Sequence, residues 1–236
     1  MSRPEKYFVP VKNLLAVEEQ EHIIKTWKEK NLQEYFLDYT SSIEKIIEKT
    51  KISFKEEDYQ RLLNGYGFEL PNNQSAKDKI KEMDITTKTS PFAFFNPINS
   101  PETFDAIGLD FINDVKLRYG ADEVVFIYGR DVSSPYHIHK DPTYYRSCNV
   151  NIPLFPDYSQ YRSTYFYETM DPSSLQVEVK YADLRTPVLL NNRKFHNCGG
   201  SPNYQGSSLA MQMGYDAKFL DVRKYLSNRG LIATPR

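Results

Sequence analysis

Hydrophobic and polar residues alternate with two different periods along this chain. Over residues 13–30, apolar side chains recur at roughly helical spacing among Glu and Lys, which predicts an amphipathic helix. Residues 101–118 predict another helix, because Pro101 stands at its first position and Gly120 stands where a C-cap glycine belongs. Further helical segments are expected at residues 32–47, 53–64 and 76–83. The first 120 residues are therefore predicted to be mainly helical.

After Gly120 the period shortens to two. Cys148, Val150 and Ile152 alternate with polar residues, which predicts a strand with one apolar face over residues 146–154. Similar short runs predict strands at residues 123–128, 136–141, 163–167, 175–181, 187–190, 194–197 and 208–213, and a short helix at 220–226. Eight short strands separated by turn signals are typical of a β-sandwich or jelly roll.

The two halves together predict an α+β chain. We expect a mainly helical layer over residues 1–120, a jelly-roll (double-stranded β-helix) core over residues 121–217 and a C-terminal tail over residues 218–236. No long linker separates the first two parts, so the helices are expected to pack against one sheet of the core rather than to form a separate domain.

Composition narrows the class of partner. The chain has 236 residues with 30 Lys and Arg against 31 Asp and Glu, and this near-zero balance argues against nucleic acid. No apolar run is long enough for a membrane-spanning helix, and the N-terminus has no secretory h-region. Cys148 and Cys198 do not make a disulfide framework. We therefore expect a cytoplasmic protein without membrane contacts, and the sequence leaves its oligomeric state open.

The most informative segment contains His137, His139 and Asp141. Residues two apart share one face of a strand, so all three point the same way if the strand is regular. The outer two are then about 13 Å apart, too far for one metal ion with bonds of about 2.0–2.2 Å. The ligand pair is thus either His137 with His139, or His139 with Asp141.

His196 is the other histidine of the strand-rich half and the candidate third ligand. Two histidines and one carboxylate, with open positions opposite, form the facial arrangement of non-heme Fe(II) oxygenases. The alternative is that His139, Asp141 and His196 are satisfied polar residues on a β surface.

The sequence His139-Lys140-Asp141, followed at a distance by His196, resembles the Fe(II)- and 2-oxoglutarate-dependent oxygenases. Residues 146–154 and 163–167 also resemble strands of small bacterial and phage-type members, and the resemblance covers about residues 123–216. It implies a jelly-roll dioxygenase in which His139, Asp141 and His196 bind Fe(II), with 2-oxoglutarate as cosubstrate. The substrate would be a small molecule or a protein side chain.

One departure concerns the cosubstrate. The family usually carries an Arg or Lys about ten residues after the distal His, but residues 205–212 contain neither. Arg146 is the first candidate for the replacement cation and Arg162 the second. Arg146 falls on the alternation face of Cys148, so we expect it in a buried ion pair. Other predicted site residues are Ser208 and Asn149 beside the cosubstrate, and His137, Tyr128 and Arg162 around the substrate; no catalytic residue beyond the metal ligands is predicted.

Three rival functions stay open. A cupin-type metal enzyme would use His137, His139 and His196, although its usual Glu is missing from residues 142–146. A non-catalytic jelly-roll module, binding or structural, would need no metal. An oxygenase that keeps iron but has lost its cosubstrate is the third.

Overall fold

The structure is a computed structural model that describes residues 4–32, 56, 75–76, 78, 92–93, 101–129, 138–141, 146–199 and 206–233. The predicted helices at 32–47 and 53–64 and most of the one at 76–83 lie outside these residues, as does His137. The division of the chain into three parts remains a prediction.

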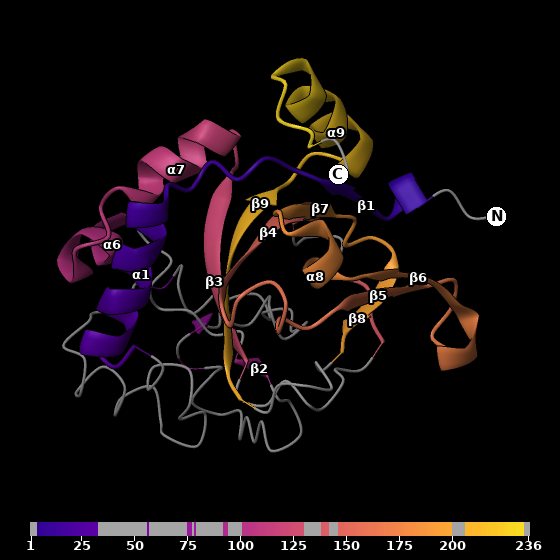
Figure 1. Cartoon of the computed structure of the whole chain (residues 1–236), viewed down its shortest axis with the longest axis horizontal. Coiled ribbons are helices and arrows are strands. Elements are labelled where there is room, and N and C mark those ends of the chain that lie inside the picture. The colour runs from indigo at the N-terminus through magenta and orange to yellow at the C-terminus, as the bar shows by residue number, and fades with distance from the viewer. Residues whose placement is uncertain are drawn as a thin grey trace.

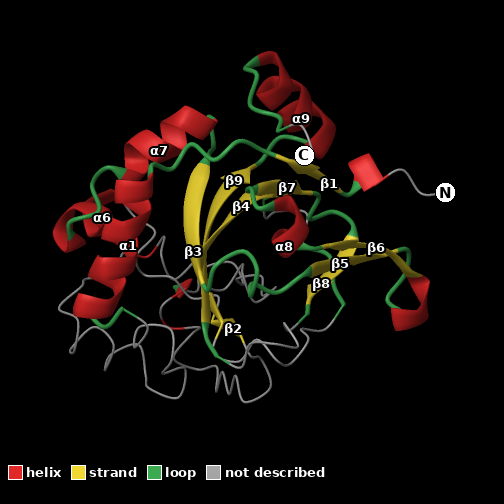
Figure 2. Ribbon diagram, viewed as in Figure 1, coloured by secondary structure: helices red, strands yellow, loops and turns green. Residues whose placement is uncertain are grey.

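Antiparallel strands form two sheets in the described part of the chain (Figures 1 and 2). The larger sheet has the order β1-β7-β4-β9-β3-β2, and the smaller has the order β6-β5-β8. The strands are β1 (Phe8–Pro10), β2 (Phe92–Ala93), β3 (Glu123–Gly129), β4 (Cys148–Phe155), β5 (Thr164–Tyr167), β6 (Leu175–Val179), β7 (Val188–Leu190), β8 (Phe195–Cys198) and β9 (Ser208–Tyr215). His139 adds an isolated antiparallel bridge to His196 of β8.

The chain passes repeatedly from one sheet to the other. It runs through β3 in the larger sheet, bridges the smaller sheet at His139, and returns to the larger sheet as β4. It then forms β5 and β6 in the smaller sheet, β7 in the larger, β8 in the smaller and β9 in the larger. This mixture of helices and antiparallel sheets is consistent with a double-stranded β-helix.

Helices pack on one face of the larger sheet, here called the outer face. They are α1 (Val17–Glu29), α6 (Pro101–Ile107), α7 (Ile112–Tyr119) and α9 (Phe219–Asn228), and Figure 1 shows α1, α6 and α7 together beside β3. One apolar core joins them to the sheet, with Trp27, Phe104 and Val222 packed among Val150 and Met211. Burial of this surface is the main favourable contribution to folding. The remaining short elements are η1 (Pro4–Lys6), η2 (Pro172–Ser174) and α8 (Tyr181–Leu184).

The helical prediction for residues 101–118 was wrong in one respect. The segment forms two helices, α6 and α7, because Gly108 follows α6 with a φ of +80°. Glycine adopts this conformation readily, and it interrupts the helix. Gly120 ends α7 with a φ of 62°, which confirms the predicted C-cap.

The N-terminal segment also contributes to the larger sheet. β1 pairs with β7, and Val11 forms a bridge with Ile232 near the other end of the chain. The phenol of Tyr119 in α7 fixes the same segment: it accepts from Leu14 N (2.9 Å) and donates to Lys12 O (3.1 Å). A three-residue strand is too short to show a period, so the sequence pattern did not reveal β1.

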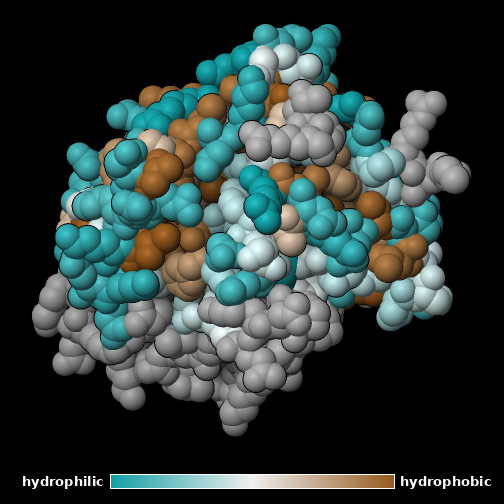
Figure 3. Space-filling model, in the orientation of Figure 1, coloured by the Kyte–Doolittle hydropathy of each residue, from teal (hydrophilic) through white to brown (hydrophobic). Residues whose placement is uncertain are grey.

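Several large hydrophobic side chains are exposed on separate elements. They include Val17, Leu117, Met170 and Leu220. Figure 3 shows hydrophobic and hydrophilic residues interspersed over the described part of one face. Single exposed hydrophobic residues are normal on protein surfaces.

Candidate metal centre

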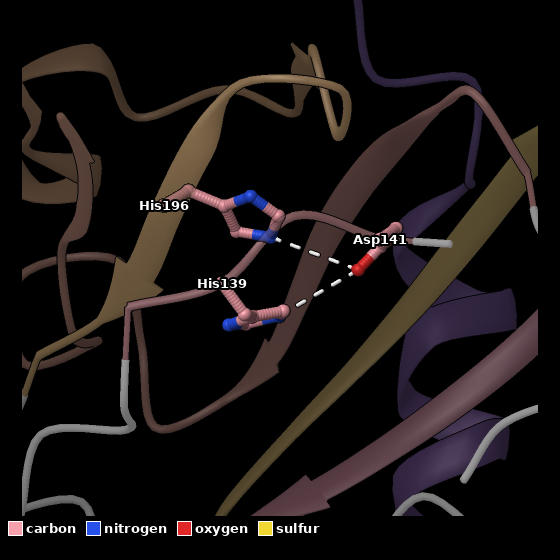
Figure 4. Close-up of side chains that lie close together, drawn as sticks. All are labelled: His139, Asp141 and His196. Atoms are coloured by element: carbon pink, nitrogen blue, oxygen red, sulfur yellow. Dashed lines mark ion pairs between the residues drawn. The ribbon is translucent and has the colours of Figure 1, made fainter. Parts of the chain in front are cut away.

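His139, Asp141 and His196 come together, with one candidate ligand atom from each lying within 4.8 Å of the others (Figure 4). The Oδ1 atom of Asp141 is 3.6 Å from Nε2 of His139 and 3.9 Å from Nε2 of His196. The two imidazole centroids are 4.5 Å apart. The side chains predicted as a triad therefore converge on one point.

Backbone pairing explains this convergence. His139 N donates to His196 O (3.0 Å) and His196 N donates to His139 O (2.8 Å), so the two histidines are directly opposite each other. Opposite residues of an antiparallel pair project from the same face. Asp141 N donates to Asn192 O (3.1 Å), which directs the chain after His139 toward the turn between β7 and β8.

The triad lies between the two sheets. Phe166 of β5 is the cross-strand partner of His196, and the two rings are 5.9 Å apart. Phe166 belongs to a second apolar cluster that includes Val188 and Ala210 of the larger sheet. The histidines therefore face the inner side of the larger sheet, opposite the face that the helices cover.

The protonation states of Asp141 and His196 suit metal binding. Burial acts to raise the pKa of Asp141, but the hydrogen bond with His139 and the charges of His196 and Arg146 outweigh it, so the pKa lies below its ordinary value. Burial lowers the pKa of His196, and Asp141 offsets this only in part. The carboxylate is thus ionised and the His196 ring neutral at pH 7. His196 Nδ1 lies 2.8 Å from Lys194 O, which assigns the ring proton to Nδ1 and leaves the Nε2 lone pair for a ligand.

Arg146 is buried, as predicted, with 4% of its surface exposed, and its Nε is 3.6 Å from Glu123 Oε1. The prediction that Arg146 lies on the Cys148 face of the strand was wrong. Gly214 is the cross-strand partner of Asn149, so a Cβ added at Gly214 would be on the Asn149 face. This Cβ would lie 2.8 Å from Arg146 Cδ, which places the Arg146 side chain on the Asn149 face as well. Regular alternation begins only at Cys148, where β4 starts, so it does not extend to Arg146.

Arg162 and Ser208 meet on the inner side of the larger sheet, beside Gly129. A Cβ at Gly129 would lie 3.0 Å from Ser208 Oγ and 3.1 and 3.2 Å from the two guanidinium nitrogens of Arg162. Arg162 is 3% exposed and Ser208 is fully buried. Within the described residues, Ser208 Oγ has no hydrogen-bond partner. A cation and a hydroxyl are therefore presented together inside the fold.

Tyr128 does not belong to this region, and its prediction as a pocket residue was wrong. Its ring packs against Trp27 of α1, with centroids 5.8 Å apart, and lies in the outer core. Alternation along β3 places it on the same face as Val124 and Phe126, away from the histidines.

Amide side chains occupy the inner face of β4 and β9, and those of Asn149 and Asn151 are buried. Asn149 Nδ2 donates to Asn192 Oδ1 (3.0 Å). Asn192 in turn accepts the backbone N–H of Asp141 at its carbonyl oxygen. Asn151 donates to the Tyr181 phenol (2.9 Å) and accepts from Gln212 (3.1 Å). Buried polar side chains usually need such partners. Here they form two groups, one of Asn149 with Asn192 and one of Asn151 with Tyr181 and Gln212.

Sequence reasoning missed the turn residues that support Asp141. Arg193 Nη1 donates to Asp141 O (3.0 Å), and Arg193 Nη2 donates to Ser147 Oγ (3.2 Å). The run Asn191-Asn192-Arg193 shows a polar turn in the sequence, but nothing in it indicates which distant backbone the guanidinium reaches.

Comparison with known proteins adds little to this geometry. No protein-family model matches the chain, and no curated protein does so either. One solved structure with a weak similarity is a vicilin from hazelnut (Corylus avellana), at 12% identity and a TM-score of 0.26. The match covers 74% of this chain but 45% of the vicilin chain. A similarity this low establishes neither the family nor the fold.

Among the described residues, no helix is both long enough and apolar enough to cross a lipid bilayer.

Proposed function

We propose that this protein is an Fe(II)- and 2-oxoglutarate-dependent dioxygenase whose metal ligands are His139, Asp141 and His196. The observation that carries the proposal is the convergence of these three side chains on one point. It is the donor set of the facial triad, which leaves coordination positions open for a cosubstrate and dioxygen.

The geometry fits a single ion. Two ligands that each lie about 2.1 Å from a metal are at most about 4.2 Å apart. The 3.6 and 3.9 Å separations from Asp141 to the two histidines are within that limit. Ligands at the 90° angles of a facial set are about 3.0 Å apart, so the side chains would move closer by less than about 1 Å when an ion binds. The carboxylate supplies negative charge, and the neutral His196 ring offers the Nε2 lone pair.

Bound iron with 2-oxoglutarate supplies oxidation of a substrate C–H bond by dioxygen, with loss of carbon dioxide and formation of succinate. The chain's own residues orient and shield the centre. Lys194 O fixes the His196 tautomer, and Phe166 packs near the same ring. The backbone bridge between His139 and His196 holds both rings on one side of the smaller sheet.

Arg162, rather than Arg146, is the better candidate for the far carboxylate of 2-oxoglutarate. Arg146 already faces a carboxylate, that of Glu123. Arg162 lies next to Ser208. Ser208 belongs to residues 205–212, where the family's usual basic residue is missing. A guanidinium and a hydroxyl together are suited to bind a carboxylate. This supports Arg162 as the substitute cation.

The test uses protein purified without oxygen. Fe(II) and then 2-oxoglutarate are added, and the visible charge-transfer band of the chelate is recorded. We expect the band in the unaltered chain and its loss in His139→Ala and His196→Ala. His22→Ala is the matched control, because His22 is exposed on α1 and bonds to Gly108 O. Arg162→Met should weaken 2-oxoglutarate binding more than Arg146→Met does.

Other outcomes would point elsewhere. Iron binding that survives Asp141→Ala would support the cupin-type set with His137 instead. Iron binding without the band would remove 2-oxoglutarate from the proposal and leave another cosubstrate or a degenerate oxygenase. No iron binding at all would favour a non-catalytic jelly-roll module.

A further inference from the structure

The turn between β7 and β8 touches two of the three candidate ligands. Asn192 O accepts the Asp141 amide (3.1 Å), Arg193 Nη1 donates to Asp141 O (3.0 Å), and Lys194 O lies 2.8 Å from His196 Nδ1. The turn itself is closed by Lys194 N donating to Asn191 O (3.1 Å). Residues 192–194 thus bind both the backbone N–H and the carbonyl of Asp141, and they fix the ring of His196.

Arg193 extends this support to the larger sheet. Its Nη2 donates to Ser147 Oγ (3.2 Å). Ser147 is anchored at the end of β9, since its N donates to Tyr215 O (2.8 Å) and its Oγ donates to Asp216 O (3.1 Å). The Arg193 guanidinium therefore connects Asp141 to Ser147, and through Ser147 to the end of β9 in the larger sheet.

We propose that Arg193 is a positioning residue that holds Asp141 in ligand geometry by forking between Asp141 O and Ser147 Oγ. The inference rests on the proposed metal centre. A planar guanidinium can donate to two acceptors at once in a fixed geometry, which an ammonium cannot reproduce. Groups that orient metal ligands typically change metal affinity by about 10–100-fold when removed.

A simple charge effect predicts the opposite result. A cation close to a metal ion repels it, so removal of the Arg193 charge would tighten metal binding if charge dominated. Removal of the fork instead frees the Asp141 backbone and weakens binding. The direction of the change separates the two explanations.

The experiment titrates Co(II) into the metal-free protein and follows the visible absorbance of the bound ion. We expect Arg193→Ala to bind Co(II) about ten-fold more weakly with an altered band shape. Arg193→Lys keeps the charge but has a single donor nitrogen in place of two, so its affinity should fall between those of Arg193→Ala and the unaltered chain. Lys224→Ala is the control, because this basic side chain is exposed on α9 and contacts none of the three candidate ligands. Equal or tighter Co(II) binding in Arg193→Ala would overturn the proposal.

A second readout needs no metal. Exchange of the Asp141 amide hydrogen, measured on metal-free protein, should be about ten-fold faster in Arg193→Ala and unchanged in Lys224→Ala. If the unaltered chain bound no Co(II), the metal centre would be refuted, and the amide exchange would still decide whether Arg193 holds Asp141. If Arg193→Ala did not fold, both measurements would be made on Arg193→Lys. Unchanged Asp141 amide exchange and unchanged Co(II) affinity in that variant would contradict the proposed role of the two Arg193 hydrogen bonds.

Discussion

The two faces of the larger sheet differ sharply although the same strands build both. On the outer face, β4 and β9 present Val150, Ile152, Met211 and Met213 to the helices, all of them fully buried. On the inner face, the intervening residues of the same strands include Asn149, Asn151 and Gln212, each hydrogen-bonded to another side chain. The period of two thus assigns packing to one face and chemistry to the other.

This difference indicates where changes should affect stability and where they should affect binding. Apolar contacts on the outer face contribute through burial, which does not depend on direction. The inner face contributes directional hydrogen bonds, whose net value is small but whose loss leaves buried groups unsatisfied. Adjacent residues of one strand can therefore be used to compare the two effects.

Ile152→Ala should have the largest effect on stability. The side chain is fully buried on the outer face, so its truncation should lower the free energy of unfolding by about 3 kcal/mol. Urea denaturation measures this loss. The folded variant should keep its metal affinity, because the side chain points away from the triad; a loss under about 1 kcal/mol would contradict the assignment of this core.

Asn151→Ala, at the neighbouring position, should cost less, about 1–2 kcal/mol. It removes the donor to Tyr181 and the acceptor for Gln212, but Tyr181 keeps a contact with Thr164 (3.3 Å). The same urea titration measures the change, and Asn228→Ala on the exposed end of α9 serves as the control. A cost above that of Ile152→Ala would reverse the ranking of the two faces.

Gly129→Ala should alter binding more than stability. The new Cβ would press on Ser208 Oγ and the Arg162 guanidinium at 3.0–3.2 Å, and the guanidinium, at the end of a flexible side chain, must shift. We expect 2-oxoglutarate affinity to fall about five-fold, which corresponds to about 1 kcal/mol. Calorimetric titration of the iron-loaded protein measures it. Unchanged affinity would count against Arg162 as the cosubstrate cation.

Glu19→Gln should have the smallest effect, and a pH-dependent one. The hydrogen bond from Arg118 holds the pKa of Glu19 below its ordinary value of 4.5. A carboxyl with a depressed folded pKa adds stability above its unfolded pKa and loses it as the pH falls through the folded value. Arg118 is 39% exposed, so solvent screening limits the contribution to about 0.5 kcal/mol at pH 7.

Thermal unfolding at pH 7 and pH 3 checks this, with Glu18→Gln as the control on the same helix turn. The difference between Glu19→Gln and the unaltered chain should shrink toward zero at pH 3. A difference that stays constant with pH would show that the ion pair is not its origin.

Most described strands were predictable because their period is local. The predicted strand at 208–213 is confirmed as β9, and that at 163–167 as β5. The strand predicted at 175–181 ends at Val179, and Tyr181 begins α8 instead. The strand predicted at 136–141 is described only from residue 138, where it forms a single bridge rather than a ladder.

The candidate triad was predictable for a related reason. His139 and Asp141 are close in sequence, and His196 is a rare residue type in the strand-rich half, so few combinations had to be weighed. The supporting residues were not predictable in this way. Arg193 reaches Asp141 across 52 positions, and only the pairing of β8 with His139 brings the two together.

By itself, the sequence determined the strand-rich character of the second half, the C-cap at Gly120 and the small set of possible metal ligands, because each depends on neighbours a few residues apart. Only the tertiary structure decided that Arg146 lies on the Asn149 side, that Tyr128 belongs to the outer core, and that Arg162 lies beside Ser208. Alternation gives the relative sides of residues within one strand. It does not fix where a strand begins or which strands become neighbours, since these depend on register between distant segments.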